Sequence, residues 1–229
     1  MNSGQTDEKK VRKIIPSKLE TGFQQFLYKT LGKRIPLWMT PNQITVIGAL
    51  GGLFGIVCAG CARFSPGFLF GVIAGLLIHL IADDLDGYVA RTRNQTSKAG
   101  AYLDLITDIM HITYLIIALS WSGYLNPAIA ILLVPVYALL MVTCMNTIQY
   151  FNEFLFPRLG PIETHLFFIV LCVCNLLYGP DPVFTVAGLA FSLADGIMVF
   201  GGVLMYYEMI RMQIQLFGRL KKVDHESKE

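Results

Sequence analysis

Six long apolar segments constrain the fold of this 229-residue chain more than any other feature. They lie at roughly residues 43–62, 67–88, 100–122, 126–150, 163–179 and 184–210, and a helix needs about 20 such residues to cross a bilayer. Only 15% of the residues are charged and 54% are hydrophobic, which excludes an ordinary soluble domain. The sequence therefore predicts an all-α integral membrane protein, built as a bundle of six transmembrane helices with short connections.

The segment before the first apolar run has the pattern of a separate surface helix. Ser17 and Glu20 have the spacing of a capping box, and Phe23 and Leu27 belong to one apolar stripe. We expect this amphipathic helix to lie at the membrane interface, while packing against the bundle stays open as an alternative. The domains expected are a basic arm with this helix at 1–40, the six-span domain at 41–211 and a tail at 212–229.

The basic residues predict the orientation of the chain. Seventeen of the eighteen lysines and arginines lie before the first span, between the second and third, between the fourth and fifth, or after the sixth; the exception is Arg63. An even number of spans places all four of these segments on one side, and the positive-inside rule assigns that side to the cytoplasm. We therefore expect a multi-pass protein with both termini in the cytoplasm.

A cluster of acids interrupts the apolar pattern in "HLIADDLDGYVARTRNQTSKAGAYLDLITD", residues 79–108. Carboxylates at bilayer depth are costly unless they face a cavity or an ion, so they mark a functional site. Asp83 and Asp86 are three residues apart, and Asp104 and Asp108 are four apart, so each pair projects from one helical face. Four converging carboxylates favour a hard divalent cation, Mg²⁺ or Mn²⁺, over zinc.

Small residues and a base lie beside these acids. Gly87 leaves the helix surface bare next to Asp86, and Gly100 lies one turn before Asp104. Arg91, one turn beyond Gly87, is placed to reach a phosphate on the same face. These features together indicate a site for a diphosphate, whereas Asp84 points away from it and is interpreted as a structural contact.

The spacing D-x2-D-G-x2-A-R-x8-G-x3-D-x3-D resembles the signature of the CDP-alcohol phosphotransferases. Its fixed positions are Asp83, Asp86, Gly87, Ala90, Arg91, Gly100, Asp104 and Asp108. All eight match without a gap, and the six expected spans are similar to those of that family. The resemblance extends over residues 36–210 or so.

This resemblance implies an enzyme that cleaves a CDP-linked donor, passes its phospho-alcohol group to an acceptor hydroxyl and releases CMP. It assigns the four aspartates of the signature to two divalent metal ions, with Asp108 also the base that takes the acceptor's proton. The nucleotide would lie against a set of residues from two parts of the chain. These residues are Asn42, Thr45, Asp83, Gly87, Ala90, Arg91 and Gly100.

Two stretches outside the signature bear on the substrates. "RIPLWMTPNQITVIG" and "GPIETHLFFI" resemble the choline and ethanolamine phosphotransferases, which predicts CDP-choline or CDP-ethanolamine as donor and diacylglycerol as acceptor. Glu163, in the second stretch, would complement an ammonium group or a lipid hydroxyl, or would only place charge at a helix start. We expect the fifth span, after Gly160 and Pro161, to border a lateral opening for the lipid.

Alternative functions stay open. Phosphatidyl transfer from CDP-diacylglycerol to inositol phosphate, glycerol phosphate or serine is one, although few bases are present to hold an acceptor phosphate. An ion or phosphate transporter is another, but the acids lie toward helix ends and no internal repeat is evident. We expect a homodimer and no binding of nucleic acid. Asp195 is interpreted as a buried pair or a subunit contact, and His79 and His111 as hydrogen-bonded interior residues.

Overall fold

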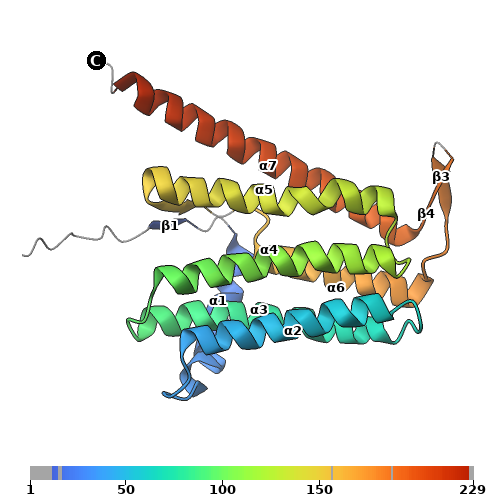
Figure 1. Cartoon of the computed structure of the whole chain (residues 1–229), viewed down its shortest axis with the longest axis horizontal. Coiled ribbons are helices and arrows are strands. Elements are labelled where there is room, and N and C mark those ends of the chain that lie inside the picture. The colour runs from blue at the N-terminus through green and yellow to red at the C-terminus, as the bar shows by residue number, and fades with distance from the viewer. Residues whose placement is uncertain (1–11, 15–16, 156, 187, 227–229) are drawn as a thin grey trace, which may run out of the picture.

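The computed structural model describes residues 12–14, 17–155, 157–186 and 188–226, so predictions for the first part of the basic arm and the last three residues lie outside it (Figure 1). Six of its helices are long and apolar enough to cross a membrane. They are α2 (Pro41–Cys61), α3 (Phe68–Thr92), α4 (Lys98–Trp121), α5 (Pro127–Phe151), α6 (Pro161–Tyr178) and α7 (Leu193–Glu226). The predicted all-α membrane bundle is therefore confirmed.

Polar residues and prolines fix where these helices begin. Thr40 forms a capping box with Gln43 at the start of α2, and the Ser97 hydroxyl accepts from the backbone N–H of Gly100 at the start of α4. Asn126 caps α5 in the same way, and α2, α5 and α6 each have proline in the first turn. Such a proline costs little because its missing N–H would be unpaired there anyway.

Helices α2 and α3 pack closely through small residues. A Cβ placed on Gly75 would lie 2.6 Å from the Cα of Gly55, and one on Gly48 would lie 2.9 Å from the Cβ of Ala82. Small residues let helix backbones approach inside a membrane, where the hydrophobic effect does not drive helices together. This antiparallel packing brings the first turns of α2 beside the acidic end of α3.

Helix α1 (Lys18–Thr30), followed by the short 3₁₀ helix η1 (Gly32–Arg34), runs across the long helices (Figure 1). Its buried face is largely polar: the Glu20 carboxylate accepts hydrogen bonds from Gln24 (2.7 Å) and from the backbone N–H of Ile162 on α6 (3.3 Å). Gln24 also donates to Asp84 on α3 (2.8 Å). Asp84 thus has the structural role predicted for it, and α1 is tied to two helices of the bundle.

Helix α1 packs against the bundle, which was the alternative considered for it, and its placement at the membrane interface stays a prediction. One face docks on α3 and α6, while Leu19 and Phe26 remain exposed on the other. The Ser17 hydroxyl accepts from the backbone N–H of Glu20, as the capping-box spacing predicts, and donates to Glu163. The Glu20 carboxylate is directed toward the bundle.

Removing the buried carboxylate of Glu20 should weaken this docking. We expect Glu20→Ala to lower the free energy of unfolding by about 1–3 kcal/mol, because buried donors on Gln24 and Ile162 lose their acceptor. Leu19→Ala, a change at an exposed neighbouring position, should have a much smaller effect. Denaturant unfolding in detergent would measure both, and equal effects would contradict the docking role of Glu20.

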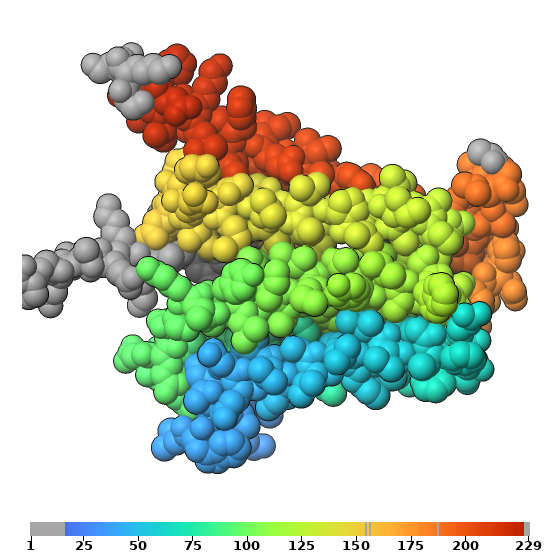
Figure 2. All heavy atoms as spheres, viewed as in Figure 1, coloured from blue at the N-terminus to red at the C-terminus, as the bar shows by residue number. Residues whose placement is uncertain are grey.

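The last predicted span differs from the structure at its start. Residues 184–191 form a hairpin of β3 (Phe184–Val186) and β4 (Leu189–Phe191), with Gly188 at a φ of +79° in the turn. The prediction of a span beginning at residue 184 is therefore wrong, because an apolar hairpin and a helix have the same hydropathy. Helix α7 begins at Leu193 and continues to Glu226, so it includes most of the segment expected as a tail. Its C-terminal part diverges from the other helices (Figure 2).

Two further details complete the fold. Asp195 is buried at the start of α7, where it accepts from the Ser192 hydroxyl (3.0 Å) and from the backbone N–H of Asn126 (2.8 Å). It thus joins α7 to α5 within the chain, which supports the buried-pair interpretation. A short parallel pair of β1 (Arg12–Ile14) and β2 (Glu153–Leu155) lies beyond α5 and has no counterpart in the prediction.

Candidate active site

Three carboxylates from two helices meet at one end of the bundle. Asp83 extends from α3, and Asp104 and Asp108 extend from α4; one oxygen from each lies within 4.8 Å of the others. All three side chains are only partly exposed. The i, i+4 spacing on α4 and the short turn between α3 and α4 produce this convergence. Closely spaced carboxylate oxygens are the ligands that Mg²⁺ and Mn²⁺ prefer, so the site fits a divalent cation.

The fourth aspartate of the signature has a different contact. Asp86 is buried one turn after Asp83, and the Thr45 hydroxyl of α2 donates a hydrogen bond to it. The structure therefore brings three of the four predicted metal ligands into one group and joins the fourth to a predicted nucleotide-binding residue. The role of Asp86 toward a metal stays a prediction.

Arg91 lies over the bare surface of Gly87, as the sequence predicts. Its Nη1 is 2.9 Å from the position that a Cβ on Gly87 would occupy, and its Nη2 donates to the hydroxyl of Tyr28 (3.0 Å). Tyr28 stacks on Tyr88 with ring centroids 4.5 Å apart, and burial raises the pKa of Tyr28 to about 12. The phenol is therefore neutral at physiological pH and holds the guanidinium in place. The sequence offered no signal for Tyr28, which lies 63 residues from Arg91.

The remaining predicted nucleotide residues lie near the same helix ends. Asn42, in the first turn of α2, faces Gly100 in the first turn of α4: a Cβ on Gly100 would be 3.0 Å from the Asn42 Oδ1. Ala90 lies on α3 next to Arg91 and is partly buried. A polar ligand could thus contact three helix ends here, although its binding to these residues stays a prediction.

Arg93 is occupied by the chain itself. Its guanidinium donates to the backbone carbonyls of residues 35, 36, 37 and 39, at distances between 2.8 and 3.5 Å. Arginine has five donors in a fixed plane, so one side chain can hold a whole turn of backbone in this way. Arg93 therefore fixes the connection between η1 and α2 through its hydrogen bonds to backbone carbonyls.

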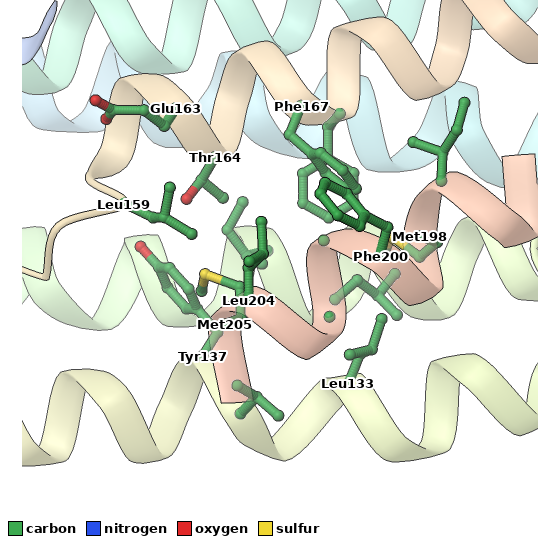
Figure 3. Close-up of a pocket in the computed structure, with 17 residues that line it drawn as sticks. Leu133, Tyr137, Leu159, Glu163, Thr164, Phe167, Met198, Phe200, Leu204 and Met205 are labelled. Carbon is green, nitrogen blue, oxygen red and sulfur yellow. The ribbon is translucent and has the colours of Figure 1, made fainter. Parts of the chain in front are cut away.

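An apolar cavity of about 340 Å³ opens among α4, α5, α6 and α7 (Figure 3). Ile112 and Ile116 line it from α4, and they follow Asp108 at intervals of four residues, so all three share one helical face. Tyr137 of α5 also lines it. The cavity is therefore adjacent to the carboxylate group.

Glu163 lies at the polar end of this cavity together with Thr164 and the hydroxyl of Tyr137 (Figure 3). Its carboxylate accepts from the backbone N–H of Gly160 (3.0 Å) and from the Ser17 hydroxyl. Glu163 therefore has one of its two predicted roles, which is to place a negative charge at the start of α6. Contact with a substrate stays a prediction.

The sequence model of the family described as CDP-alcohol phosphatidyltransferase matches residues 38–213. The chain belongs to this family. The match covers α2 to α6 and most of the apolar part of α7, and it includes every carboxylate of the site. The resemblance carried by the signature is thereby confirmed, and the description names a class of transferase enzymes.

Three curated relatives match shorter parts of the chain. A bifunctional IPC transferase and DIPP synthase from Aquifex aeolicus is 45% identical over 69 residues, which is 30% of this chain and 15% of that protein. Cholinephosphotransferase 1 from Xenopus laevis is 28% identical over 96 residues, 39% of this chain and 24% of the relative. An uncharacterized CDP-alcohol phosphatidyltransferase class-I family protein 2 from Dictyostelium discoideum is 24% identical over 157 residues, which is 64% of this chain and 37% of that protein. The matches thus span well under half of each relative's length.

His79 and His111 were interpreted as hydrogen-bonded interior residues; both are buried, but the predicted hydrogen bonds are not seen among the described residues. Both ring nitrogens of His111 and the Nδ1 of His79 are buried without a hydrogen-bond partner in the described part of the chain. A third histidine, His165 of α6, lies beside them and was not singled out in the sequence. Its position 54 residues beyond His111 gives no local spacing from which to predict the contact.

Proposed function

We propose that this protein transfers a phospho-alcohol group from a CDP-linked donor to the hydroxyl of a lipid acceptor and releases CMP. The observation that carries the proposal is the shared face of α4, on which Asp108 of the carboxylate group is followed by two residues that line the apolar cavity. A polar donor and an apolar acceptor would meet at Asp108. The substrates proposed are CDP-choline or CDP-ethanolamine with diacylglycerol.

The carboxylates of Asp83, Asp104 and Asp108 would hold the divalent cations, with Asp86 one turn from Asp83. When bound, Mg²⁺ or Mn²⁺ would neutralise the diphosphate and stabilise the charge on the leaving oxygen. Two ions are proposed, because one cation leaves a group of three or four carboxylates with net negative charge.

The chain would hold the donor through side chains at three helix ends. Arg91, fixed by Tyr28, would pair with a phosphate, since its guanidinium offers two parallel donors. Gly87 and Gly100 would allow the nucleotide to approach the backbone. Asn42 and Ala90 would contact the nucleotide at the same helix ends, and Thr45 would keep Asp86 in position.

Asp108 would act as the base. Its carboxylate takes the proton of the acceptor hydroxyl, the acceptor oxygen bonds to the phosphorus that carries the alcohol, and the bond from that phosphorus to the oxygen of CMP breaks. CMP leaves with the electron pair of that bond. Glu163, Thr164 and Tyr137 would orient the polar part of the lipid at the end of the cavity.

A metal titration of CMP release would test this function. We expect Asp83→Asn to raise the Mg²⁺ concentration required for half-maximal activity by at least about 10–100-fold. Removing a group that only supports a metal ligand already lowers metal affinity by about this factor, and Asp83 is proposed to bind the metal directly. Asp84→Asn is the matched control: it removes the same charge one residue away, from a carboxylate directed toward α1. Metal-independent CMP release, or equal shifts in both variants, would contradict the proposed site.

One alternative retains support from the cavity. CDP-diacylglycerol could place its acyl chains there and pass a phosphatidyl group to a polar alcohol. A phosphorylated acceptor would need free bases, but Arg93 is bound to backbone carbonyls and Arg211 donates to Glu208. The transporter interpretation is less favoured, because the family described for this chain consists of transferases.

Two further features belong to the proposal. We place both termini and the site on the cytoplasmic side. The basic residues Arg91, Arg93 and Lys98 lie at the connection between α3 and α4, at the end of the bundle that carries the carboxylates, and support this orientation. Labelling of single introduced cysteines would test it.

We also propose a homodimer, which crosslinking in native membranes would test.

A further inference from the structure

Three buried histidines from three helices meet below the carboxylate group. His79 lies on α3, His111 on α4 and His165 on α6, and their ring centroids are 4.0 to 5.7 Å apart. Each residue is only 3–4% exposed, and one nitrogen from each lies within 4.8 Å of the others. The chain has four histidines, and the fourth, His225, is exposed near the end of α7.

The hydrogen bond of His165 determines which of its nitrogens is free. Its Nδ1 lies 2.8 Å from the carbonyl oxygen of Pro161, and a carbonyl only accepts, so this nitrogen carries the hydrogen. The Nε2 then has a lone pair, and it is buried without a partner among the described residues. A lone pair directed into a cluster of imidazoles is available to a ligand.

His79 differs from His165, because its contact with a carboxylate is longer than a hydrogen bond: its Nε2 lies 3.7 Å from the Oδ1 of Asp108. Its Nδ1, like both nitrogens of His111, has no hydrogen-bond partner in the part of the chain that the structure describes. Buried polar atoms in native proteins are almost always paired, and one ion bound through one nitrogen of each histidine would pair three of these four nitrogens.

Helix α2 leaves room for this cluster. Gly52 faces the two closest rings: a Cβ at this position would lie 2.9 Å from His79 and 3.2 Å from His111. The rings therefore occupy space that any larger residue would fill. The absence of a side chain on α2 allows both imidazoles to turn toward His165.

We propose that His79, His111 and His165 form a binding site for a transition-metal ion, with zinc as the expected occupant. Three imidazole nitrogens and one open position are a common ligand set for Zn²⁺. Histidines that bind metals usually donate their other N–H to a carbonyl or a carboxylate, which matches Pro161 for His165. Mg²⁺ prefers oxygen ligands, so the histidine site and the carboxylate site would select different metals.

Metal content measured by mass spectrometry would test the site directly. The full chain, purified without a polyhistidine tag and stripped with a chelator, is dialysed against zinc in the presence of excess Mg²⁺, which competes for the carboxylates. We expect one tightly bound zinc per chain, retained in His225→Ala and in Asp104→Asn. His111→Ala and His165→Ala each remove a proposed zinc ligand. Each should lower the affinity for zinc by more than the roughly 10–100-fold that follows when a residue hydrogen-bonded to a metal ligand is removed.

Cobalt provides a readout that does not depend on the variants folding. Co²⁺ bound to three imidazoles in a tetrahedral site absorbs visible light strongly, whereas Co²⁺ among carboxylates in an octahedral site absorbs weakly. The unmodified protein should show the strong bands, and zinc should remove them. Weak bands only, zinc lost equally in Asp104→Asn and His111→Ala, or no retained zinc would overturn the proposal. CMP release is not measured, so the result is independent of the proposed function.

Discussion

Replacing Asp108 with asparagine is expected to lower CMP release by about 10²–10⁴-fold, the usual contribution of a general base. The amide has nearly the same shape as the carboxylate but cannot take the acceptor's proton. Because Asp83 and Asp104 remain, the CDP-linked donor should still bind in a metal-dependent way. Calorimetric titration of the donor with and without Mg²⁺, together with an assay of CMP release, would separate these two effects.

Asp104→Asn is the matched control for this experiment. It makes the same chemical change one turn earlier on α4, in the same group of carboxylates but farther from the residues of the cavity. We expect Asp104→Asn to weaken metal and donor binding together and to recover activity at higher Mg²⁺. If Asp108→Asn released CMP at the normal rate, Asp108 would not be the base. If added Mg²⁺ restored the activity of Asp108→Asn, Asp108 would act only as a metal ligand.

The expected outcome for Asp108 depends on a convergence of three carboxylates that the sequence predicted, while their roles stay predictions. The spacing of Asp104 and Asp108 fixes one helical face, and the turn formers between α3 and α4 bring Asp83 to it. Local rules suffice here because all three acids lie within 26 residues of one another. Gly87 and Arg91 were predictable for the same reason, being one turn apart on one helix.

Contacts between distant segments were not predictable in this way. Tyr28 supports Arg91 from α1, and His165 reaches His79 from α6; neither residue has a spacing that relates it to its partner. The polar contacts of α1 were also missed, because Glu20 was interpreted only as the capping-box partner of Ser17 and Gln24 has no distinguishing spacing in the sequence. They are buried because they bond to α3 and α6.

The boundaries of the spans show where hydropathy stops being informative. Five of the six predicted spans begin within two residues of a helix start in the structure, because polar caps and prolines mark those positions. The sixth was placed too early, since "VFTVAGLAF" is apolar but forms a hairpin around Gly188. Helix α7 was also expected to end at about residue 210, because a helix can leave the bilayer without ending and hydropathy marks only the membrane boundary.

The last prediction concerns the substrates: CDP-choline or CDP-ethanolamine with diacylglycerol should release CMP faster than CDP-diacylglycerol with inositol phosphate, glycerol phosphate or serine. The cavity beside Asp108 is apolar, and Arg93 and Arg211 are engaged within the chain. Purified protein in mixed micelles, given each donor and acceptor pair separately, would measure the difference. If the amino-alcohol pair is preferred, Glu163→Gln should reduce its turnover more than it reduces the binding of CMP.

A variant that fills the cavity distinguishes the two substrate assignments even if both pairs show activity. Leu204 lines the cavity, whereas the adjacent Val203 is 62% exposed and does not, so Leu204→Trp and Val203→Trp add the same ring to different surfaces. If diacylglycerol occupies the cavity, Leu204→Trp should raise its KM and leave the binding of CDP-choline unchanged, while Val203→Trp should alter neither. If CDP-diacylglycerol places its chains there, Leu204→Trp should instead weaken donor binding. That result, or activity confined to CDP-diacylglycerol, would overturn the donor assignment and leave the carboxylate site as proposed.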